Sequence, residues 1–193
     1  MRQITALAWM LLFCACLAAP GQGATKPNII FILTDDLGYG DVGAYGATPN
    51  LIRTPRIDRL AEEGIQFTDG HAPASTCTPS RYSFLTGEYA WRTPGTGIAS
   101  GVDPLLIRAG SVTVPSMLRG AGYATAVVGK WHLGLGDGTT DYNSPPVKPG
   151  PLEVGFDYYF GPPATGDRVP CVFMENHTIF GYDPADPLEV SYS

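Results

Sequence analysis

The chain has 193 residues, of which 44% are hydrophobic and 16% are charged, a composition typical of a globular domain that argues against a disordered chain. Its formal net charge of -6 and its pI near 4.9 argue against nucleic acid as a partner, because phosphate binding requires a clustered basic surface. Its 24 glycines and 18 prolines predict many turns and loops, where binding and catalytic residues are often found.

The N-terminus has the pattern of a secretory signal peptide. One positive charge precedes an apolar run that is shorter than the about 20 residues of a membrane span, and small residues follow. We expect cleavage between Ala19 and Ala24. Residues 1–23 would then be a signal peptide, and the mature chain, residues 24–193, would be exported to the periplasm or secreted, with no membrane span.

Four cysteines bear on the fate of the exported chain. Phe13–Cys16 could be a degenerate lipoprotein box that leaves Cys16 lipidated, and a retained membrane anchor is a second alternative to simple export. Cleavage removes Cys14 and Cys16, so Cys77 and Cys171 remain. Because exported thiols tend to pair, a disulfide between these two is one expectation, and a chemical role for Cys77 is the other.

The first elements of the mature chain read as a strand, a helix and a second strand. Asn28–Thr34 is an apolar run rich in β-branched residues, typical of a strand buried on both faces of a parallel sheet. Thr54–Glu63 predicts a helix that starts with threonine and proline and ends at Gly64. Ile65–Thr68 predicts a strand that completes a right-handed βαβ unit, so the expected fold class is α/β, a mostly parallel sheet flanked by helices.

Further elements follow along the chain. Threonine and proline again mark a helix start, so we expect a helix over residues 79–85 that ends near Gly87, with Cys77 just before its first turn. Residues 113–119 predict a short helix, and residues 123–128 predict another buried strand.

The C-terminal part of the chain predicts less regular structure. Gly136–Asp167 is rich in Gly, Pro, Asp and Thr and reads as a long surface loop in which only Val154–Phe160 packs. A hairpin is expected around Glu175–His177.

Candidate chemical groups fall where open α/β sheets bind ligands, at the carboxyl ends of strands. Asp35 and Asp36 follow the first predicted strand and offer hard oxygen ligands suited to Ca²⁺ or Mg²⁺. Two ligands are too few for such an ion, and both residues could instead cap the loop. Lys130 and His132 follow a later strand. Because they are two residues apart, their side chains would leave the same face of an extended segment and could bind one anion together. The alternative is an ordinary solvated strand end with a histidine that has no chemical role.

Cys77 is expected at a helix N-terminus, where free N–H groups and the helix dipole stabilise negative charge. Arg81, one turn later on the same side, can donate two hydrogen bonds to an oxyanion. A disulfide to Cys171 would leave this arrangement unused.

The motifs around these residues resemble those of type I sulfatases, members of the alkaline phosphatase superfamily. Cys77–Arg81, followed by Leu85–Gly87, resembles the C-x-P-x-R signature of that family. Pro27–Asp41 is similar to its opening strand with metal-binding aspartates, and Gly129–Gly134 is similar to its G-K-W-H-x-G box. The matches run in the family's order and cover essentially all of the chain after the signal peptide, which implies an alkaline phosphatase-like sulfatase fold.

The resemblance also implies cofactors and a maturation partner. Cys77 would be oxidised to Cα-formylglycine during export by a formylglycine-generating or sulfatase-maturating enzyme. Asp35, Asp36 and the modified Cys77 would bind Ca²⁺, with Mg²⁺ the less expected ion.

The same resemblance assigns roles in the hydrolysis of sulfate esters. Arg81 would hold the aldehyde hydrate, Lys130 would contact the sulfate, and His132 would assist collapse of the hydrate. One hydroxyl of the hydrate would attack sulfur, and the second would lose its proton and expel sulfate.

Part of the family pattern has no counterpart in this sequence. We find neither the later Asp-Asn metal ligands nor the later histidine and lysine, and we interpret His177 as a hairpin histidine. We therefore expect the N-terminal part of a longer sulfatase catalytic domain, acting on a small-molecule or carbohydrate sulfate ester. Two alternatives stay open: an inactive secreted remnant, and a phosphodiesterase or phosphonate hydrolase of the same superfamily.

Overall fold

The computed structural model of the protein describes residues 25–48, 51–188 and 190. The predicted signal peptide, with its alternative lipoprotein box, lies outside the described residues. Across the described ranges, no helix combines the length and the apolar character that crossing a membrane requires.

A small open sheet lies at the centre of the fold. Its strands are β1 (Ala126–Val128), β2 (Tyr158–Gly161), β3 (Met174–Glu175) and β4 (Thr178–Ile179), and they lie side by side in chain order. β1 and β2 are parallel, whereas β2, β3 and β4 pair antiparallel. The α/β class is confirmed, as is the hairpin, and the sheet of the described part is mixed.

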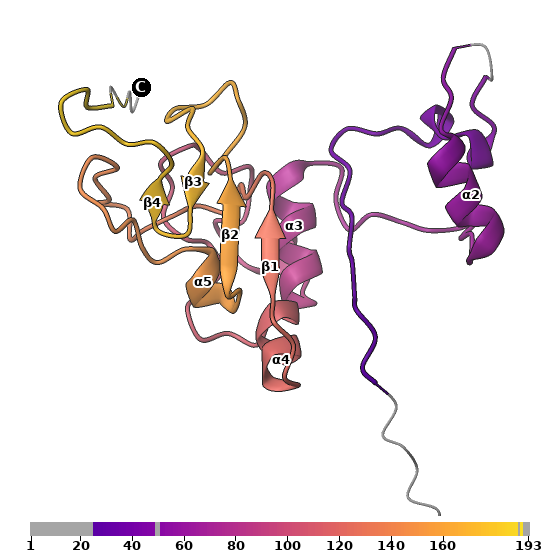
Figure 1. The fold of residues 1–193 in the computed structure, drawn as a ribbon, viewed down its shortest axis with the longest axis horizontal. Coiled ribbons are helices and arrows are strands. Elements are labelled where there is room, and N and C mark those ends of the chain that lie inside the picture. Colours follow the sequence, from indigo (N-terminus) through magenta and orange to yellow (C-terminus); the bar gives the residue numbers. More distant parts are fainter. Residues whose placement is uncertain (1–24, 49–50, 189, 191–193) are drawn as a thin grey trace, which may run out of the picture.

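Helices flank the sheet. Figure 1 shows α3 (Cys77–Thr86) and α4 (Val114–Gly120) beside β1, and α5 (Pro151–Val154) next to β2. α2 (Pro55–Glu63) and α4 are close to their predicted bounds. α3 starts earlier than expected because Thr76, two residues before Thr78, takes the N-cap position. The described residues also form three short 3-10 turns: η1 (Tyr39–Asp41), η2 (Gly43–Tyr45) and η3 (Ala90–Arg92).

The segment around α2 forms a small lobe apart from the sheet (Figure 1). Asp58 of α2 accepts hydrogen bonds from Ala44 N at 2.7 Å and from Thr54 Oγ1 at 2.9 Å. Gln66 then donates to Ala44 O at 2.8 Å, so the chain after α2 returns to the η2 turn. These hydrogen bonds are all made within the lobe and hold its segments together.

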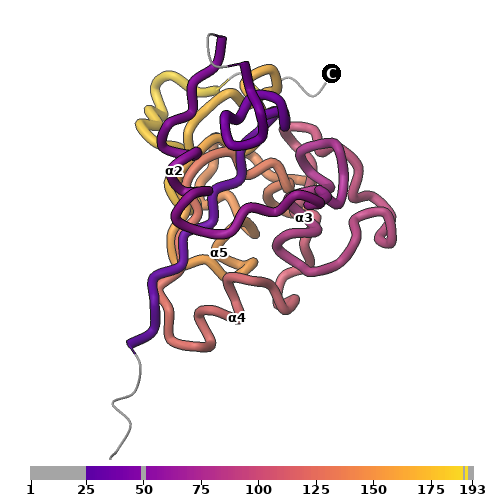
Figure 2. The backbone as a smooth tube through the Cα atoms, turned by 90° about the vertical axis from the view of Figure 1, so that its right-hand side faces the viewer, coloured from indigo at the N-terminus to yellow at the C-terminus, as the bar shows by residue number. Residues whose placement is uncertain are grey.

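The two strands expected on either side of α2 are not formed. Asn28–Thr34 runs as an extended arm, visible in Figure 2, and Ile65–Thr68 is irregular. A strand requires a hydrogen-bonded neighbour, and no described segment pairs with either run. Ile30 is 84% exposed and Ile32 is 76% exposed, so the expected burial and the βαβ unit are wrong for the described structure. Phe31 nevertheless stacks on Phe84 of α3, with ring centroids 3.6 Å apart.

Two further expectations need correction. The predicted strand over residues 123–128 is limited to β1, and Val128 is 73% exposed because no described strand pairs with the other edge of β1. The predicted surface loop over residues 136–167 packs more than expected, since Tyr142 and Val147 are each 1% exposed. The segment also contains α5 and β2, so a regular helix and a paired strand form where a loop was predicted.

The core lies between the sheet, α3 and the segment that follows β1. Its centre is the indole of Trp131, which contacts the rings of Phe156 and Tyr159 at centroid distances of 6.4 and 6.3 Å. The buried side chains around it include Leu133, Leu135 and Met174. Burial of each such side chain stabilises the fold by about 1.5–3 kcal/mol.

Candidate active site

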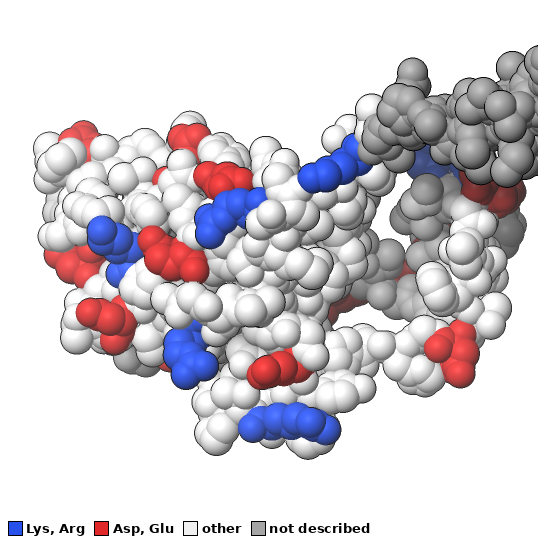
Figure 3. All heavy atoms as spheres, turned by 90° about the horizontal axis from the view of Figure 1, so that it is seen from below, with Lys and Arg blue, Asp and Glu red and all other residues white. Residues whose placement is uncertain are grey.

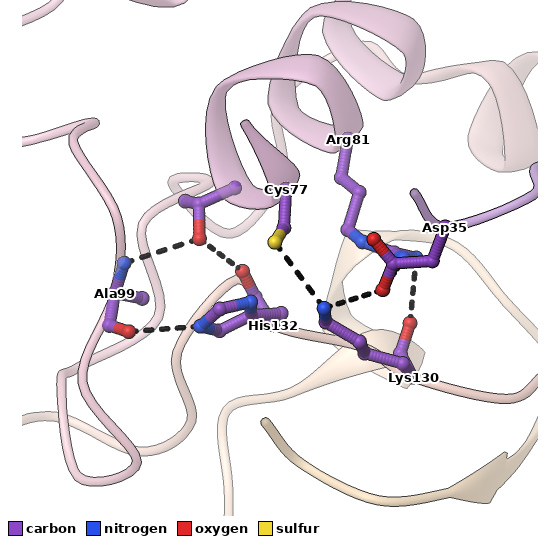
Figure 4. A network of polar contacts seen from close by, with 7 residues as sticks. Asp35, Cys77, Arg81, Ala99, Lys130 and His132 are labelled. Carbon is purple, nitrogen blue, oxygen red and sulfur yellow. Dashed lines mark hydrogen bonds and ion pairs between the residues drawn. The ribbon is translucent and has the colours of Figure 1, made fainter. Parts of the chain in front are cut away.

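Cys77 is the first residue of α3, at the helix end that favours negative charge. The N-cap Thr76 makes no side-chain capping bond, so the first N–H groups of the helix are not satisfied in that way. Cys77 Sγ accepts a hydrogen bond from Lys130 Nζ at 3.2 Å (Figure 4). Both Cys77 and Cys171 are free thiols, so the expected disulfide is absent, and the thiol of Cys171 donates instead to Gly166 O at 3.1 Å.

Lys130 reaches the thiol because the segment after β1 is fixed on both sides of it. Gly129 N donates to Phe160 O at 2.8 Å and Trp131 N donates to Pro162 O at 3.1 Å, which extends the pairing with the β2 segment. The buried Trp131 side chain points into the core, and its Nε1 donates to Gly134 O at 2.8 Å. The segment therefore buries Trp131 and leaves Lys130 directed at Cys77.

Gly134 closes this segment in a conformation that other residues adopt poorly. Its φ is +73°, and a Cβ at this position would lie 1.9 Å from Pro104 O. Leu135 N then donates to Asp103 O at 2.9 Å, which joins the segment to the loop before it. Steric crowding and a positive φ therefore explain why the last residue of the G-K-W-H-x-G box is a glycine.

Asp35 lies against both cations of the site. Its Oδ2 is 2.5 Å from Lys130 Nζ and 3.4 Å from Arg81 Nη2. The hydrogen bond from Lys130, followed by the charges of Lys130 and Arg81, holds the pKa of Asp35 below its usual value. Asp35 is therefore a carboxylate at neutral pH.

Arg81 connects the helix to the segment that carries Lys130. Its Nη1 donates to Lys130 O at 2.8 Å, and its side chain is only 14% exposed. Since Arg81 Nη2 also meets Asp35, one guanidinium joins α3, the N-terminal arm and the segment after β1 (Figure 4). The predicted Cys77, Arg81, Lys130 and Asp35 are thus brought together in one place.

His132 is present in the same network, in an orientation that the sequence did not predict. Its φ of +54° breaks the extended geometry on which one shared face with Lys130 was predicted. The side chain is buried, and Nε2 lies 2.9 Å from Ala99 O. Burial, followed by the positive charges of Lys130, Arg168 and Arg81, lowers the pKa of His132, and the bond to Ala99 only partly opposes this. The imidazole is therefore neutral at neutral pH.

Asp36 is the second carboxylate that was predicted to bind a metal ion. Asp36 follows Asp35 with a φ of +58°, is exposed, and supplies the same hard oxygen chemistry. Among the described residues, however, no group of three or more His, Cys, Asp and Glu side chains could hold a metal ion. The donor type fits Ca²⁺ or Mg²⁺, but the number of ligands does not.

Two features of the site had no signal in the sequence. Thr78 occupies the variable position of the C-x-P-x-R signature, yet it is fully buried and bonds the backbone of His132. His132 N donates to Pro163 O at 2.9 Å, in a loop that also brings the charge of Arg168 near the imidazole. Both features depend on burial and on contacts with residues distant in the sequence, which only the structure shows.

Charges are mixed on the surface outside the site. In Figure 3 the acidic and basic side chains of the visible face alternate without a broad patch of either sign.

Comparison with known proteins identifies the family. The family model described as Sulfatase matches residues 27–170, so the chain belongs to the sulfatase family. The N-acetylgalactosamine-6-O-sulfatase of Bacteroides thetaiotaomicron is 56% identical over 173 residues, which cover 89% of this chain and 33% of that protein. Human arylsulfatase A is 40% identical over 176 residues, which cover 90% of this chain and 31% of the relative.

Solved structures agree with this assignment. A structure from work on the metabolism of multiple glycosaminoglycans by Bacteroides thetaiotaomicron superposes with a TM-score of 0.81 at 55% identity, over 85% of this chain and 34% of the other. A sulfatase from Pseudoalteromonas sp. superposes with a TM-score of 0.55 at 34% identity, over 73% of this chain and 26% of the other. The chain thus spans about a third of the length of the Bacteroides thetaiotaomicron relative and of the solved Bacteroides thetaiotaomicron chain that it matches.

Proposed function

We propose that the whole protein hydrolyses sulfate esters, with residue 77 as the nucleophile. The observation that carries this proposal is the position of the Cys77 thiol, at the N-terminus of α3 and 3.2 Å from Lys130 Nζ. Arg81 lies one helical turn further on and joins the same cluster through Lys130 O and Asp35. A helix N-terminus and two cations form a site that favours an anionic substrate.

Oxidation of Cys77 to formylglycine would give, in its hydrated form, one hydroxyl that attacks sulfur and a second that later expels the sulfate. The residues around it have complementary tasks. Lys130 places a positive charge beside the reacting oxygen, where it stabilises the negative charge that develops in the transition state. Arg81 keeps Lys130 in place by binding its backbone carbonyl at 2.8 Å. The free, half-buried thiol of Cys77 supports this assignment, because a disulfide would have prevented the oxidation.

His132 would act on protons in this site. Its neutral imidazole can accept a proton from a hydroxyl at residue 77, as general-base catalysis requires. The lowered pKa of His132 keeps the ring in its accepting form at neutral pH.

We propose that Asp35 and Asp36 contribute two oxygen ligands to a Ca²⁺ site of the whole protein, with Mg²⁺ the less suited ion. When bound, the ion would polarise the sulfuryl oxygens. Asp35 is kept ionised by Lys130 and Arg81, as a metal ligand must be. Asp36 is exposed beside it.

The substrate we propose is a sulfated carbohydrate. The relative with 56% identity is named for N-acetylgalactosamine 6-O-sulfate hydrolysis, and the match covers 89% of this chain. Export to the periplasm or secretion, through the predicted signal peptide, belongs to the same proposal, as does a maturating enzyme that oxidises Cys77.

Sulfate release from N-acetylgalactosamine 6-sulfate by the purified full-length protein tests the proposal. We expect turnover by the wild type and loss of at least about a thousandfold in Cys77→Ala, because that variant lacks the nucleophile. Cys171→Ala is the matched control and should keep wild-type activity. A matched phosphate diester is assayed in parallel. Preference for the diester would show a phosphodiesterase, and inactivity on both substrates would favour a non-catalytic remnant.

A further inference from the structure

We propose that Thr78 is a positioning residue that, together with the backbone of Ala99, fixes the orientation and the tautomer of His132. In this arrangement Nε2 carries the ring proton, and Nδ1 is the atom available to accept one. The role of His132 as a catalytic base rests on the proposed function, whereas its orientation and tautomer can be tested separately.

Three hydrogen bonds form a closed network around Thr78. Its side chain is fully buried, and its Oγ1 donates to His132 O at 2.8 Å while accepting from Ala99 N at 3.1 Å. The third bond joins Ala99 O to His132 Nε2 at 2.9 Å. The hydroxyl of Thr78 thus connects α3 to the two segments that hold the imidazole, and Figure 4 shows the bond between Ala99 and His132.

The partner of Nε2 decides the tautomer. A backbone carbonyl can only accept a hydrogen bond, so Nε2 of His132 must donate to Ala99 O. Nδ1 is buried and has no partner among the described residues. A proton on Nδ1 would place an unsatisfied donor, and a positive charge, in a buried position beside Lys130, which is unfavourable. The neutral form with a free lone pair on Nδ1 is therefore the stable one.

The free nitrogen is on the side of the ring where the chemistry takes place. In Figure 4 the imidazole lies between Ala99 on one side and Cys77 with Lys130 on the other. Since Nε2 is directed at Ala99, the Nδ1 edge is directed toward Cys77 and Lys130. Thr78 directly follows Cys77 on α3, so a single helical turn sets the positions of both the nucleophile and the base.

Threonine suits this position because of its hydroxyl. Valine has nearly the same shape but would leave Ala99 N and His132 O without their partner in a buried place. The two segments would then relax, and His132 would lose its defined orientation. Serine keeps the hydroxyl and should preserve the network.

Nitrogen NMR of the full-length protein labelled with ¹⁵N-histidine measures the tautomer directly, with His132→Gln used for assignment. We expect His132 to show a protonated Nε2 and an unprotonated Nδ1 in the wild type and in Thr78→Ser. Thr78→Val should show a mixture of tautomers. Thr86→Val is the matched control, because the hydroxyl of Thr86 bonds only at its own end of α3, donating to Tyr82 O at 2.8 Å and accepting from Glu88 N at 3.2 Å.

Kinetics provide the second readout. We expect Thr78→Val to lower kcat roughly 10- to 100-fold with little change in KM, because a small misplacement of a catalytic group has effects of this order. Thr78→Ser and Thr86→Val should stay within about twofold of the wild type.

Three outcomes would overturn the inference. These are a proton on Nδ1 in the wild type, an unchanged tautomer in Thr78→Val, and equal losses of kcat in Thr78→Ser and Thr78→Val. If Thr78→Val does not fold, the tautomer of His132 in the NMR spectra of the wild type and of Thr78→Ser still tests the inference. The predicted tautomer in a protein that releases no sulfate would support the positioning role and refute the proposed function instead.

Discussion

Arg81 shows how one side chain determines the geometry of a site. Its guanidinium donates to Lys130 O at 2.8 Å and meets Asp35 at 3.4 Å, so it holds two different segments against α3. The planar fork of arginine allows two such bonds in fixed directions, whereas the ammonium group of lysine is a point charge on a flexible stem. Arg81 therefore positions neighbouring segments in addition to supplying a positive charge.

Arg81→Lys should lower kcat/KM by about 100-fold, because it keeps the charge but loses the fork that positions Lys130. Steady-state sulfate release by the full-length protein measures this effect. Arg108→Lys is the matched control, since Arg108 is an exposed arginine. Equal activity of Arg81→Lys and the wild type would show that charge alone suffices.

At the scale of elements, a carboxylate of α5 fastens the β3–β4 hairpin to the rest of the fold. Glu153 Oε1 lies 3.0 Å from Nε2 of His177, in the hairpin turn, and Glu153 Oε2 accepts from Gly150 N at 2.7 Å. His177 O also accepts from Val147 N at 2.8 Å. This structural role agrees with the interpretation of His177 as a hairpin histidine.

The pKa of Glu153 reflects these contacts. Burial by itself would raise this pKa, but the hydrogen bonds from Gly150 N and His177 outweigh it, so the pKa lies below its ordinary value of 4.5. A carboxyl group with a lowered pKa stabilises the fold at pH values above the ordinary one. That contribution is lost as the pH falls through the lowered value.

Glu153→Gln should lower the free energy of unfolding at neutral pH by about 1–2 kcal/mol, because a charge-assisted bond is lost. The difference from the wild type should shrink as the pH falls below 4.5, the ordinary pKa of the group. Urea unfolding of the full-length protein across this range measures both effects. Glu62→Gln, at an exposed position of α2, is the control; a difference that does not change with pH would contradict the account.

On the scale of the whole molecule, local patterns in the sequence were sufficient for α2 and α4, whereas α5 formed within a segment predicted as a loop. The threonine and proline that start α2 and the glycine that follows it act within a few residues, and the helix has the predicted bounds. The hairpin of β3 and β4 was likewise predicted from its turn. The motif residues Cys77 and Lys130, far apart in the sequence, meet as their shared family resemblance implied.

Features that depend on distant partners could not be predicted in this way. The apolar run Asn28–Thr34 has the composition of a buried strand, but a strand forms only against a neighbour, and none of the described segments provides one. The bond of Thr78 to His132 joins positions 54 residues apart, and the positive φ of His132 has no signal in the sequence. Composition and spacing identify the residues of the site, whereas tertiary contacts orient them.

The chemical state of Cys77 in the exported full-length protein is the most direct test of the central claim. Trypsin releases residue 77 in the peptide Leu60–Arg81, and mass spectrometry of this peptide reports any change at the cysteine. We predict a loss of about 18 Da at Cys77, the mark of oxidation to formylglycine, with Cys171 unchanged in its own peptide. An unmodified thiol at Cys77, or a disulfide to Cys171 with a mass about 2 Da below that of the two thiols, would contradict the proposed nucleophile.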